Sequence, residues 1–522
     1  MHLLERSQEI VPEIGSRTIN RRSLLGMVGA AGFTIATRGL TKSALAQADA
    51  GQIDELVIDL PSELPSLDPA LVYDIDGWSI IHSIYDSVLQ YQPNGEIELL
   101  LAKSLTQSDP LTWEIELVPD VKFHNGEPLT SQAVTFAIAH LVDDKTASQV
   151  GGNFKIIERV EEIDELKARL HLSAPAPWLP SMMAAWLTLL PPDYAAANDF
   201  AATPVGTGPY KFVEYAQGDH LALEANPDYF QSSPKGQPIA KKVTFRFVPE
   251  AITRVADLLS GSAGIIRTDP GNGELLEQQG LASVVAEPVS GSSFIRIATD
   301  AEPFRDARVR QALNFAVDVD TIIHALFYGH GSHLASLFVE GGLGFDPNLT
   351  PFPHDPEKAK SLLAEAGFPT GFSTQIEHTV DEGIDVIEAI VGQLGAVGIK
   401  AERQPRDKAA FNQSWKDPKA APLRFVTWRP LFDPYTLLSL VISNQGFLSR
   451  YSSDTAQPLI DAGAVEPDPA KRAQTYQQLA KVLQDDPAAI YLYNLTALYG
   501  TAKGVPEWTQ RPDDYIIPAK RP

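Results

Sequence analysis

Alternation of apolar and polar residues is the first regularity along this chain of 522 residues. A strand places successive side chains on opposite faces of a sheet, so an alternating run is typical of a strand with one buried face. Such runs cover residues 53–60, 111–118 and 241–248. A further strand is expected over residues 294–299, with a turn at residues 291–293 before it.

Four other stretches repeat apolar residues at intervals of three and four, which predicts amphipathic helices. Each follows a residue that can cap a helix N-terminus, and these residues are Thr130, Asp306, Asp355 and Asp468. After the last two, proline stands at the first helical position, where no backbone N–H is needed. Each helix is expected to pack its apolar face on a lobe and to expose the other face.

The length predicts more than one lobe, because a single core stops growing near roughly 250–300 residues. No repeat and no low-complexity run is found in the sequence. Clusters of proline and glycine at residues 191–192, 203–209 and 269–273 indicate lobe edges, and none of them is a long linker. We therefore expect lobes built from discontinuous segments and joined by short crossings, which suits hinge closure around a ligand.

Residues 1–46 have the pattern of an export signal, with Arg21-Arg22, a weakly apolar run over residues 24–35 and a cleavage site after Ala46. The run is interrupted by glycines and is too short to span a bilayer. The adjacent arginines resemble a twin-arginine signal, and an ordinary secretory signal is the alternative. Either signal would take the protein out of the cytoplasm.

The charge balance excludes nucleic acid as a partner. The chain has 42 basic and 66 acidic residues, a net charge of −24, which disfavours contact with phosphate backbones. Removing the six basic and three acidic residues of the signal makes the mature charge −27. The chain has no cysteine, which excludes disulfides, thiolate metal sites and a lipidated cysteine. We therefore expect an unlipidated periplasmic protein.

Motifs for catalysis are missing from the sequence. It contains neither G-x-S-x-G nor H-E-x-x-H, and the glycines at residues 206–208 lack the rest of a phosphate loop. His330 and His333 are interpreted as loop residues, and Asp74 and Asp76 as solvated loop charges. We predict no enzyme activity, no metal and no cofactor. The remote alternative is an exported hydrolase that uses His124 or His330.

Aromatic residues near turns are candidates for lining a cleft, since their rings bind small molecules by burial and orient them through a polar edge. They are Tyr73, Trp78, Trp186, Trp428, Phe432 and Tyr435. Core packing is the alternative for each ring. It is less favoured for Trp428, because residues 427–434 form a turn-rich segment at the end of a predicted strand.

Six sequence blocks in a fixed order identify a family resemblance. They are residues 67–69 (LDP), 121–129 (VKFHNGEPL), 206–210 (GTGPY), 226–230 (NPDYF), 304–314 (FRDARVRQALN) and 355–359 (DPEKA). Together they resemble the extracellular solute-binding proteins of family 5, the peptide, dipeptide and nickel receptors of ABC importers. The resemblance covers nearly all of the chain after residue 46.

The resemblance implies an α/β fold of the two-lobe periplasmic-binding-protein type II (cluster C), with an additional third domain and a hinge. It places lobe I at residues 47–93, 196–290 and 493–522, the additional domain at 94–195, and lobe II at 291–492. It also implies a monomer that captures a small peptide or peptide-like solute and delivers it to the ABC transporter permease in the inner membrane. A metal chelate, an opine or a sugar conjugate remains the alternative ligand.

The resemblance also indicates ligand contacts. Trp428 matches the cleft tryptophan of the family, and Tyr73 lies in a segment that contributes to the same cleft. Phe432 and Trp186 complete the expected aromatic lining. Peptide-binding relatives often carry an aspartate where this chain has Leu431, so a free peptide amine lacks its usual partner here. Arg429 is predicted to bind a carboxylate or phosphate of the ligand through two parallel hydrogen bonds.

Overall fold

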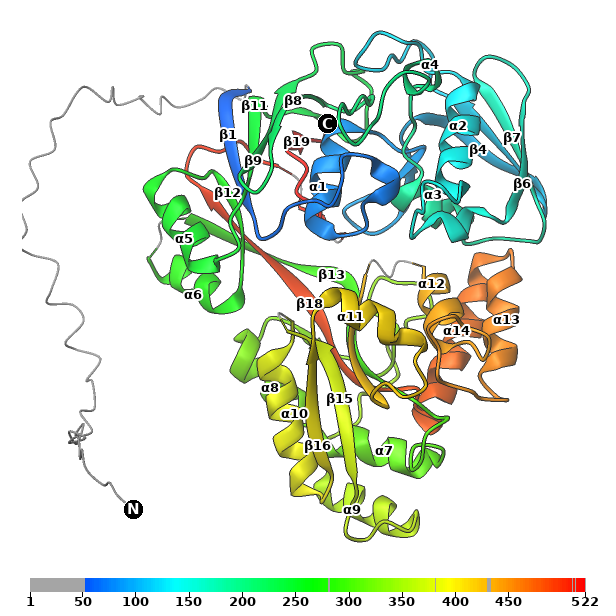
Figure 1. The fold of residues 1–522 in the computed structure, drawn as a ribbon, viewed down its shortest axis with the longest axis vertical. Helices are drawn as coiled ribbons and strands as arrows, with labels where there is room; N and C mark the ends of the chain where they lie inside the picture. Colours follow the sequence, from blue (N-terminus) through cyan, green and yellow to red (C-terminus); the bar gives the residue numbers. More distant parts are fainter. Residues whose placement is uncertain are drawn as a thin grey trace, which may run out of the picture. The chain divides into compact units, whose positions relative to one another are not determined.

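The computed structural model describes residues 52–279, 282–380, 382–429, 433–508, 510–511 and 513–521, and every structural statement below concerns these residues. The predicted export signal lies outside them. An eleven-stranded mixed sheet dominates the fold, and a separate four-stranded antiparallel sheet stands beside α2 and α3 (Figure 1).

The large sheet has the strand order β16-β15-β17-β13-β18-β12-β1-β11-β9-β8, with β14 paired to β18. Its strands are β1 (Ile53–Leu60), β8 (Tyr210–Ala216), β9 (His220–Ala225), β11 (Ala240–Phe247), β12 (Ile265–Thr268), β13 (Ala282–Ile297), β14 (Ser332–His333), β15 (Ser373–Thr379), β16 (Lys400–Arg406), β17 (Leu423–Trp428) and β18 (Ala489–Ala502). The order is not that of the sequence, so segments far apart in the chain meet as neighbours.

The small sheet has the order β4-β5-β7-β6, and two strand pairs, β2 with β3 and β10 with β19, complete the strands described. The bounds are β2 (Leu89–Tyr91), β3 (Ile97–Leu99), β4 (Ala102–Asp109), β5 (Thr112–Leu117), β6 (Ile157–Glu162), β7 (Lys167–Leu172), β10 (Gln237–Pro238) and β19 (Ala519–Lys520).

Fourteen α-helices accompany the sheets in the described part of the chain. They are α1 (Ile75–Ile84), α2 (Ser131–Val142), α3 (Leu179–Trp186), α4 (Pro192–Ala195), α5 (Ala251–Ser260), α6 (Pro270–Gln279), α7 (Ala307–Ala316), α8 (Val319–Phe327), α9 (Pro356–Glu365), α10 (Ile384–Ala396), α11 (Lys408–Gln413), α12 (Tyr435–Leu437), α13 (Gln457–Val465) and α14 (Pro469–Asp485). Short turns of 3-10 or π-helix are η2 (Pro69–Leu71), η3 (Gly151–Phe154), η4 (Ser414–Lys416) and η5 (Leu438–Ile442).

The strands predicted at residues 53–60, 111–118 and 241–248 are confirmed within one residue, as β1, β5 and β11, and the four predicted helices begin directly after their capping residues, as α2, α7, α9 and α14. The bounds of the strand predicted at residues 294–299 were wrong, because β13 runs from Ala282 to Ile297. The carboxylates of Asp306, Asp355 and Asp468 each accept a backbone N–H in the first helical turn at 2.9 Å. Thr130 stands at the N-cap position of α2, but its side chain makes no capping hydrogen bond. Helix α2 therefore begins where the sequence pattern predicted, although the Thr130 side chain does not cap it.

The turn predicted at residues 291–293 was wrong, because these residues lie inside the long strand β13. The pairing of β13 with β18 shifts register between Pro288 and Ser292, which is how a bulge accommodates extra residues. The Asn494 side-chain amide donates to the carbonyls of Val289 and Gly291, at 2.6 Å each. A side chain from the neighbouring strand thus satisfies carbonyls at the irregular pairing.

Strands β13 and β18 connect two groups of elements. Residues 498–501 of β18 pair with β12, whereas residues 292–297 of β13 pair with β17. The cores on either side are separate clusters, one around β1, β9 and β11 and another around α7, α10 and β15. Two strands that join two cores are a suitable hinge, since small changes in their twist move one core relative to the other.

A buried ion pair fixes the end of α1 against the loop before β10. Lys235 Nζ lies 2.5 Å from Asp86 Oδ1 and donates to the carbonyls of His82 and Tyr85, at 2.8 and 3.1 Å. Thr207 donates to the second oxygen of Asp86 at 3.1 Å. Burial lowers the pKa of Lys235, and the charge of Asp86 opposes that shift. Each charge therefore depends on the other.

Candidate functional site

The end of strand β17 carries two of the predicted site residues. Trp428 is the last residue of the strand, pairs with Ser292 of β13, and packs its partly buried ring against the core around α13 and α14. Arg429 follows beside Gly291, where an added Cβ would lie 2.8 Å from the Arg429 Cβ. The glycine therefore allows Arg429 to lie against β13.

Arg429 forms an ion pair with the C-terminal segment of the chain. Its Nη1 donates to Asp514 Oδ2 at 2.9 Å. The Arg429 side chain is 34% exposed, whereas that of Asp514 is 3% exposed. A guanidinium fixed on one side and open to solvent on another can still bind an anionic group of a ligand.

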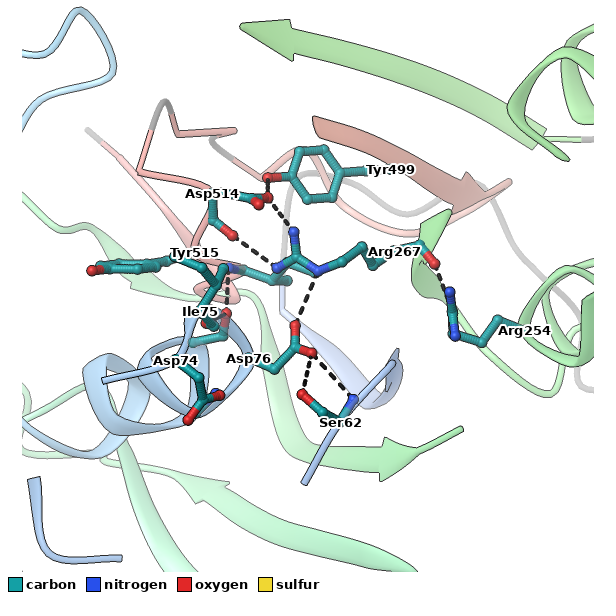
Figure 2. Close-up of polar contacts among 12 residues, drawn as sticks. Ser62, Asp74, Ile75, Asp76, Arg254, Arg267, Tyr499, Asp514 and Tyr515 are labelled. Atoms are coloured by element: carbon teal, nitrogen blue, oxygen red, sulfur yellow. Dashed lines mark hydrogen bonds and ion pairs between the residues drawn. The ribbon is translucent and has the colours of Figure 1, made fainter. Parts of the chain in front are cut away.

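Asp514 belongs to a network of charges shown in Figure 2. Its Oδ1 accepts from Arg267 Nη1 and from the Tyr499 hydroxyl, and its carbonyl accepts from Arg267 Nη2 at 2.8 Å. Arg267 Nε donates to Asp76 Oδ1 at 3.0 Å, and Asp76 Oδ2 accepts from the backbone N–H and the hydroxyl of Ser62, at 3.1 and 2.8 Å. The carboxylate that holds Arg429 is thus itself held by Arg267 of β12 and Tyr499 of β18.

The pKa of Arg267 follows from this network. Burial alone would lower it, but Asp514 and Asp76 raise the pKa above its usual value. Asp76 is buried, so its interpretation as a solvated loop charge was wrong. The reason is tertiary: β12 places Arg267 beside the first turn of α1, 191 residues away in sequence.

Asp74 was also misread as a solvated loop charge. It caps α1 by accepting the Gly77 N–H at 2.7 Å, and Figure 2 shows its side chain turned away from the Asp76 carboxylate. Burial raises its pKa, the Gly77 hydrogen bond opposes this shift, and the charge of Asp76 adds to it. Lys408 of α11 acts on it in the opposite sense. Asp74 is therefore a partly buried carboxylate whose charge interacts with Asp76 and with Lys408 of α11.

The remaining predicted aromatics differ in their surroundings. Tyr73 is 41% exposed, immediately before Asp74. Trp186 ends α3 and packs its partly buried ring against both the core of the small sheet and the core around β1. Trp78 is fully buried in the latter core. Phe432 lies outside the described residues. Among the predicted aromatic residues, Tyr73 directly precedes Asp74 and Trp428 directly precedes Arg429 in the sequence.

His124, one of the two histidines considered for catalysis, is bound to the loop at residues 206–208. His124 Nε2 lies 3.0 Å from the Gly208 carbonyl, and its Nδ1 accepts the Gly206 N–H at 3.4 Å. Burial lowers the pKa of His124 to about 4, so the neutral ring holds the 206–208 loop at neutral pH. Within the described residues, no group of three or more histidine, aspartate and glutamate side chains is arranged to hold a metal ion.

A cavity of about 660 Å³ is lined mostly by polar residues. It lies between the end of β13 and the loop before α13, and its lining includes Asp300, Arg305, Arg450 and Asp454. Arg450 is already paired with Asp300 at 2.8 Å. None of the predicted ligand contacts lines this cavity, so its size alone does not make it the candidate site.

Sequence reasoning missed Asp514, Arg267 and the role of Asp74. No local pattern marks them, because the residues that pair with Arg267 stand 191 and 247 positions away. A carboxylate next to Tyr73, in the segment already expected to line the cleft, was the one signal that could have drawn attention to Asp74.

Comparison with known proteins finds a sequence family and similar folds. The model of the bacterial extracellular solute-binding proteins, family 5 Middle, matches residues 96–448. The glutathione-binding protein GsiB of Pectobacterium atrosepticum is 29% identical over 355 residues, which are 67% of this chain and 68% of that protein.

Solved structures extend the similarity to nearly the whole chain. The periplasmic binding protein DppA of Helicobacter pylori, in complex with the peptide STSA, has a TM-score of 0.78 and 23% identity, and covers 90% of this chain and 99% of its own. The binding protein MoaA of A. tumefacien R10, in complex with mannopinic acid, has a TM-score of 0.75 and 24% identity, with 90% and 99% coverage.

Proposed function

The chain belongs to the bacterial extracellular solute-binding proteins of family 5, the substrate-binding proteins of ABC importers, and we propose that its solute is a short peptide or peptide-like compound. The predicted α/β fold of type II periplasmic binding proteins is confirmed by the structural similarities. The matched relative GsiB is named as a glutathione-binding protein. We also propose that the protein catalyses no reaction. Incubation with peptides followed by mass analysis tests this, since a receptor returns its ligand intact.

The proposed lobes are those of the sequence analysis: residues 47–93, 196–290 and 493–522 for lobe I, 94–195 for the additional domain and 291–492 for lobe II. The long pair β13 and β18 supports this division, because it runs from β12 to β17. The solute would be enclosed between the lobes, where contacts made only in the closed form drive closure.

One observation carries the ligand assignment: a carboxylate, Asp74, and a guanidinium, Arg429, stand in opposite proposed lobes and are both partly exposed. Asp74 is the N-cap residue of α1, and Arg429 directly follows β17. A short peptide carries an ammonium and a carboxylate, which these two groups can bind. Asp74 would thereby supply the carboxylate that position 431 lacks. Trp428 and Tyr73 would contact the apolar parts of the solute.

The names of similar proteins support a peptide-like solute. GsiB is named for glutathione, and the DppA structure holds a tetrapeptide, whereas the MoaA structure holds an opine. A chelate, an opine or a sugar conjugate is therefore the alternative. Native mass spectrometry of the protein purified from its own cells would detect a trapped solute as an added mass.

A thermal-shift panel decides between these ligand classes. Saturation at about 100 times Kd stabilises a protein by about 2.7 kcal/mol, which gives a measurable shift in Tm. The panel holds di- to pentapeptides, glutathione, mannopinic acid and a nickel–histidine chelate. We expect a shift with peptides or glutathione. A shift with only the opine or the chelate would refute the peptide assignment.

Replacing Arg429 with alanine is expected to weaken binding of a carboxylate-bearing solute by about 10- to 100-fold, the range for charge-assisted hydrogen bonds. Isothermal titration at low salt measures the change. Arg429→Lys is the matched control, because it keeps the charge without the planar fork and should lose less. A peptide amide, which has no carboxylate, should lose little. Unchanged affinity for the free acid would exclude this contact.

Replacing Asp74 with asparagine is expected to weaken binding of peptides that carry a free amine by about 10-fold or more. Asparagine still caps a helix, so α1 should persist. Because the pKa of Asp74 is raised, its ionised form lowers stability above that pKa, and the ligand-free variant should be at least as stable as the wild type at pH 7. Wild-type affinity should fall as the pH drops through the raised pKa. N-acetylated peptides are the control, and equal losses for both peptide forms would contradict the contact.

We propose a periplasmic location after twin-arginine export and cleavage near Ala46, with no lipid anchor. The family is extracellular by description, and the sequence has no cysteine for lipid attachment. Among the residues that the structure describes, no helix is long and apolar enough to cross a bilayer. Replacing Arg21 and Arg22 with lysine should leave the precursor in the cytoplasm. Export of that variant at the wild-type level would favour the general secretory route.

A further inference from the structure

Tyr435 and Trp178 form a parallel aromatic stack between parts of the chain that have separate cores. Their ring centroids are 3.8 Å apart and their planes differ by 6°. Trp178 directly precedes α3, is 4% exposed and belongs to the core of the small sheet. Tyr435 packs against that same core, although Leu437 and Leu438, two and three residues later, belong to the core around α13 and α14. The Tyr435 ring therefore contacts the core of the small sheet, whereas the residues that follow it pack in the core around α13 and α14.

The backbone of Tyr435 is fixed on its own side by a buried ion pair. Asp433 Oδ1 accepts the Tyr435 N–H at 2.9 Å. Both oxygens of Asp433 also accept from Arg472 of α14, at 2.5 and 2.9 Å, and both side chains are buried. The turn is thus anchored to α14 by two parallel hydrogen bonds, so the ring is presented in one direction.

Arg429 and Tyr435 stand six residues apart and contact different partners. Arg429 pairs with Asp514 of the C-terminal segment, and Tyr435 stacks on Trp178 beside α3. Both partners lie outside residues 291–492, the proposed lobe II. If the lobes separate about β13 and β18, both contacts must break. The stack differs from the ion pair in that it needs no charge and is little affected by salt.

We propose that Tyr435 is a positioning residue for solute capture: its stack on Trp178 forms when the lobes close and holds the additional domain against lobe II. This inference rests on the proposed function. Tyr435 then increases affinity without touching the solute, because apparent affinity is proportional to the population of the binding-competent form. The ring face, and not the phenol hydroxyl, makes the contact.

The test compares Tyr435→Ala with Tyr435→Phe, which keeps the ring. The chain has no cysteine, so Asp144→Cys and Glu357→Cys introduce two unique dye sites. Both side chains are largely exposed, and they lie in the additional domain and in lobe II respectively. Single-molecule energy transfer then measures the closed fraction with and without solute, and stopped-flow measures the dissociation rate.

We expect Tyr435→Ala to lower the closed fraction and to raise Kd by about 2- to 10-fold, the range for one aromatic pair, mainly through faster dissociation. Tyr435→Phe should match the wild type in both measurements. An unchanged closed fraction in Tyr435→Ala would overturn the proposal, as would a Tyr435→Phe variant that behaves like alanine. If the wild type binds no peptide in the panel, the proposed function fails, whereas the closed fraction of the ligand-free variants still tests the stack.

Discussion

Replacing Asp514 with alanine is expected to lower the free energy of unfolding by about 3–5 kcal/mol, the range for removing one partner of a buried ion pair. Asp514 Oδ1 accepts from Arg267 and Tyr499, and its Oδ2 accepts from Arg429. Its loss leaves the mostly buried Arg267 with Asp76 as its remaining carboxylate partner. Chemical denaturation followed by circular dichroism measures the change.

Asp514→Asn is the matched control for this prediction, because it keeps the shape of the side chain and removes its charge. It should be destabilised less than the alanine variant, since an amide oxygen can still accept one of the hydrogen bonds. Arg429→Ala should have a small effect on stability, because Arg429 is one-third exposed and its ion pair is partly screened by solvent. A stability of Asp514→Ala within about 1 kcal/mol of wild type would mean that the network contributes little.

Replacing Lys235 with methionine is expected to destabilise the protein by a similar amount, about 3–5 kcal/mol. Asp86 is fully buried, and Lys235 is its one ion-pair partner among the described residues. The variant would also leave the carbonyls of His82 and Tyr85 without the Lys235 donor. Thermal and urea unfolding of the purified variant measure the loss.

The double variant Lys235→Met with Asp86→Leu separates an unpaired charge from lost packing. Replacing both members of a buried pair by apolar residues is often neutral, so the double variant should recover much of the stability lost by Lys235→Met. The recovery of stability should be incomplete, because the carbonyls of His82 and Tyr85 and the hydroxyl of Thr207 still lose their hydrogen-bond partners. A double variant that is as unstable as the sum of both single variants would show that the charges do not depend on each other.

Local patterns predicted much of the fold. Residues 53–60 form β1 with the predicted bounds, and the capping carboxylates of Asp306, Asp355 and Asp468 begin helices as expected. These features depend on residues that are neighbours in sequence, where a cap or an alternating pattern acts within a few residues. The turn at 291–293 failed for the opposite reason, because a bulge is defined by the partner strand, β18.

The candidate site was predicted in part. Trp428 and Arg429 stand at the end of a strand, as the turn-rich segment after β17 indicated. Asp74 and Asp76 were read as solvated, although one caps α1 and the other pairs with Arg267. Two aspartates two residues apart have the same appearance in a sequence whether they are solvated or buried. Their ligand contacts, like those of Trp428, Tyr73 and Arg429, stay predictions that the experiments above test.

The sequence by itself determined the alternating and amphipathic segments, the lack of cysteine and the ordered blocks of family 5, because each of these is written in neighbouring residues or in composition. Only the tertiary structure decided that Arg267 lies between Asp76 and Asp514, and that Tyr435 stacks on Trp178. The reason is physical: the energy of a charge or a ring depends on which partners and how much solvent surround it. Those surroundings are assembled from segments that stand 191, 247 and 257 residues apart in the chain.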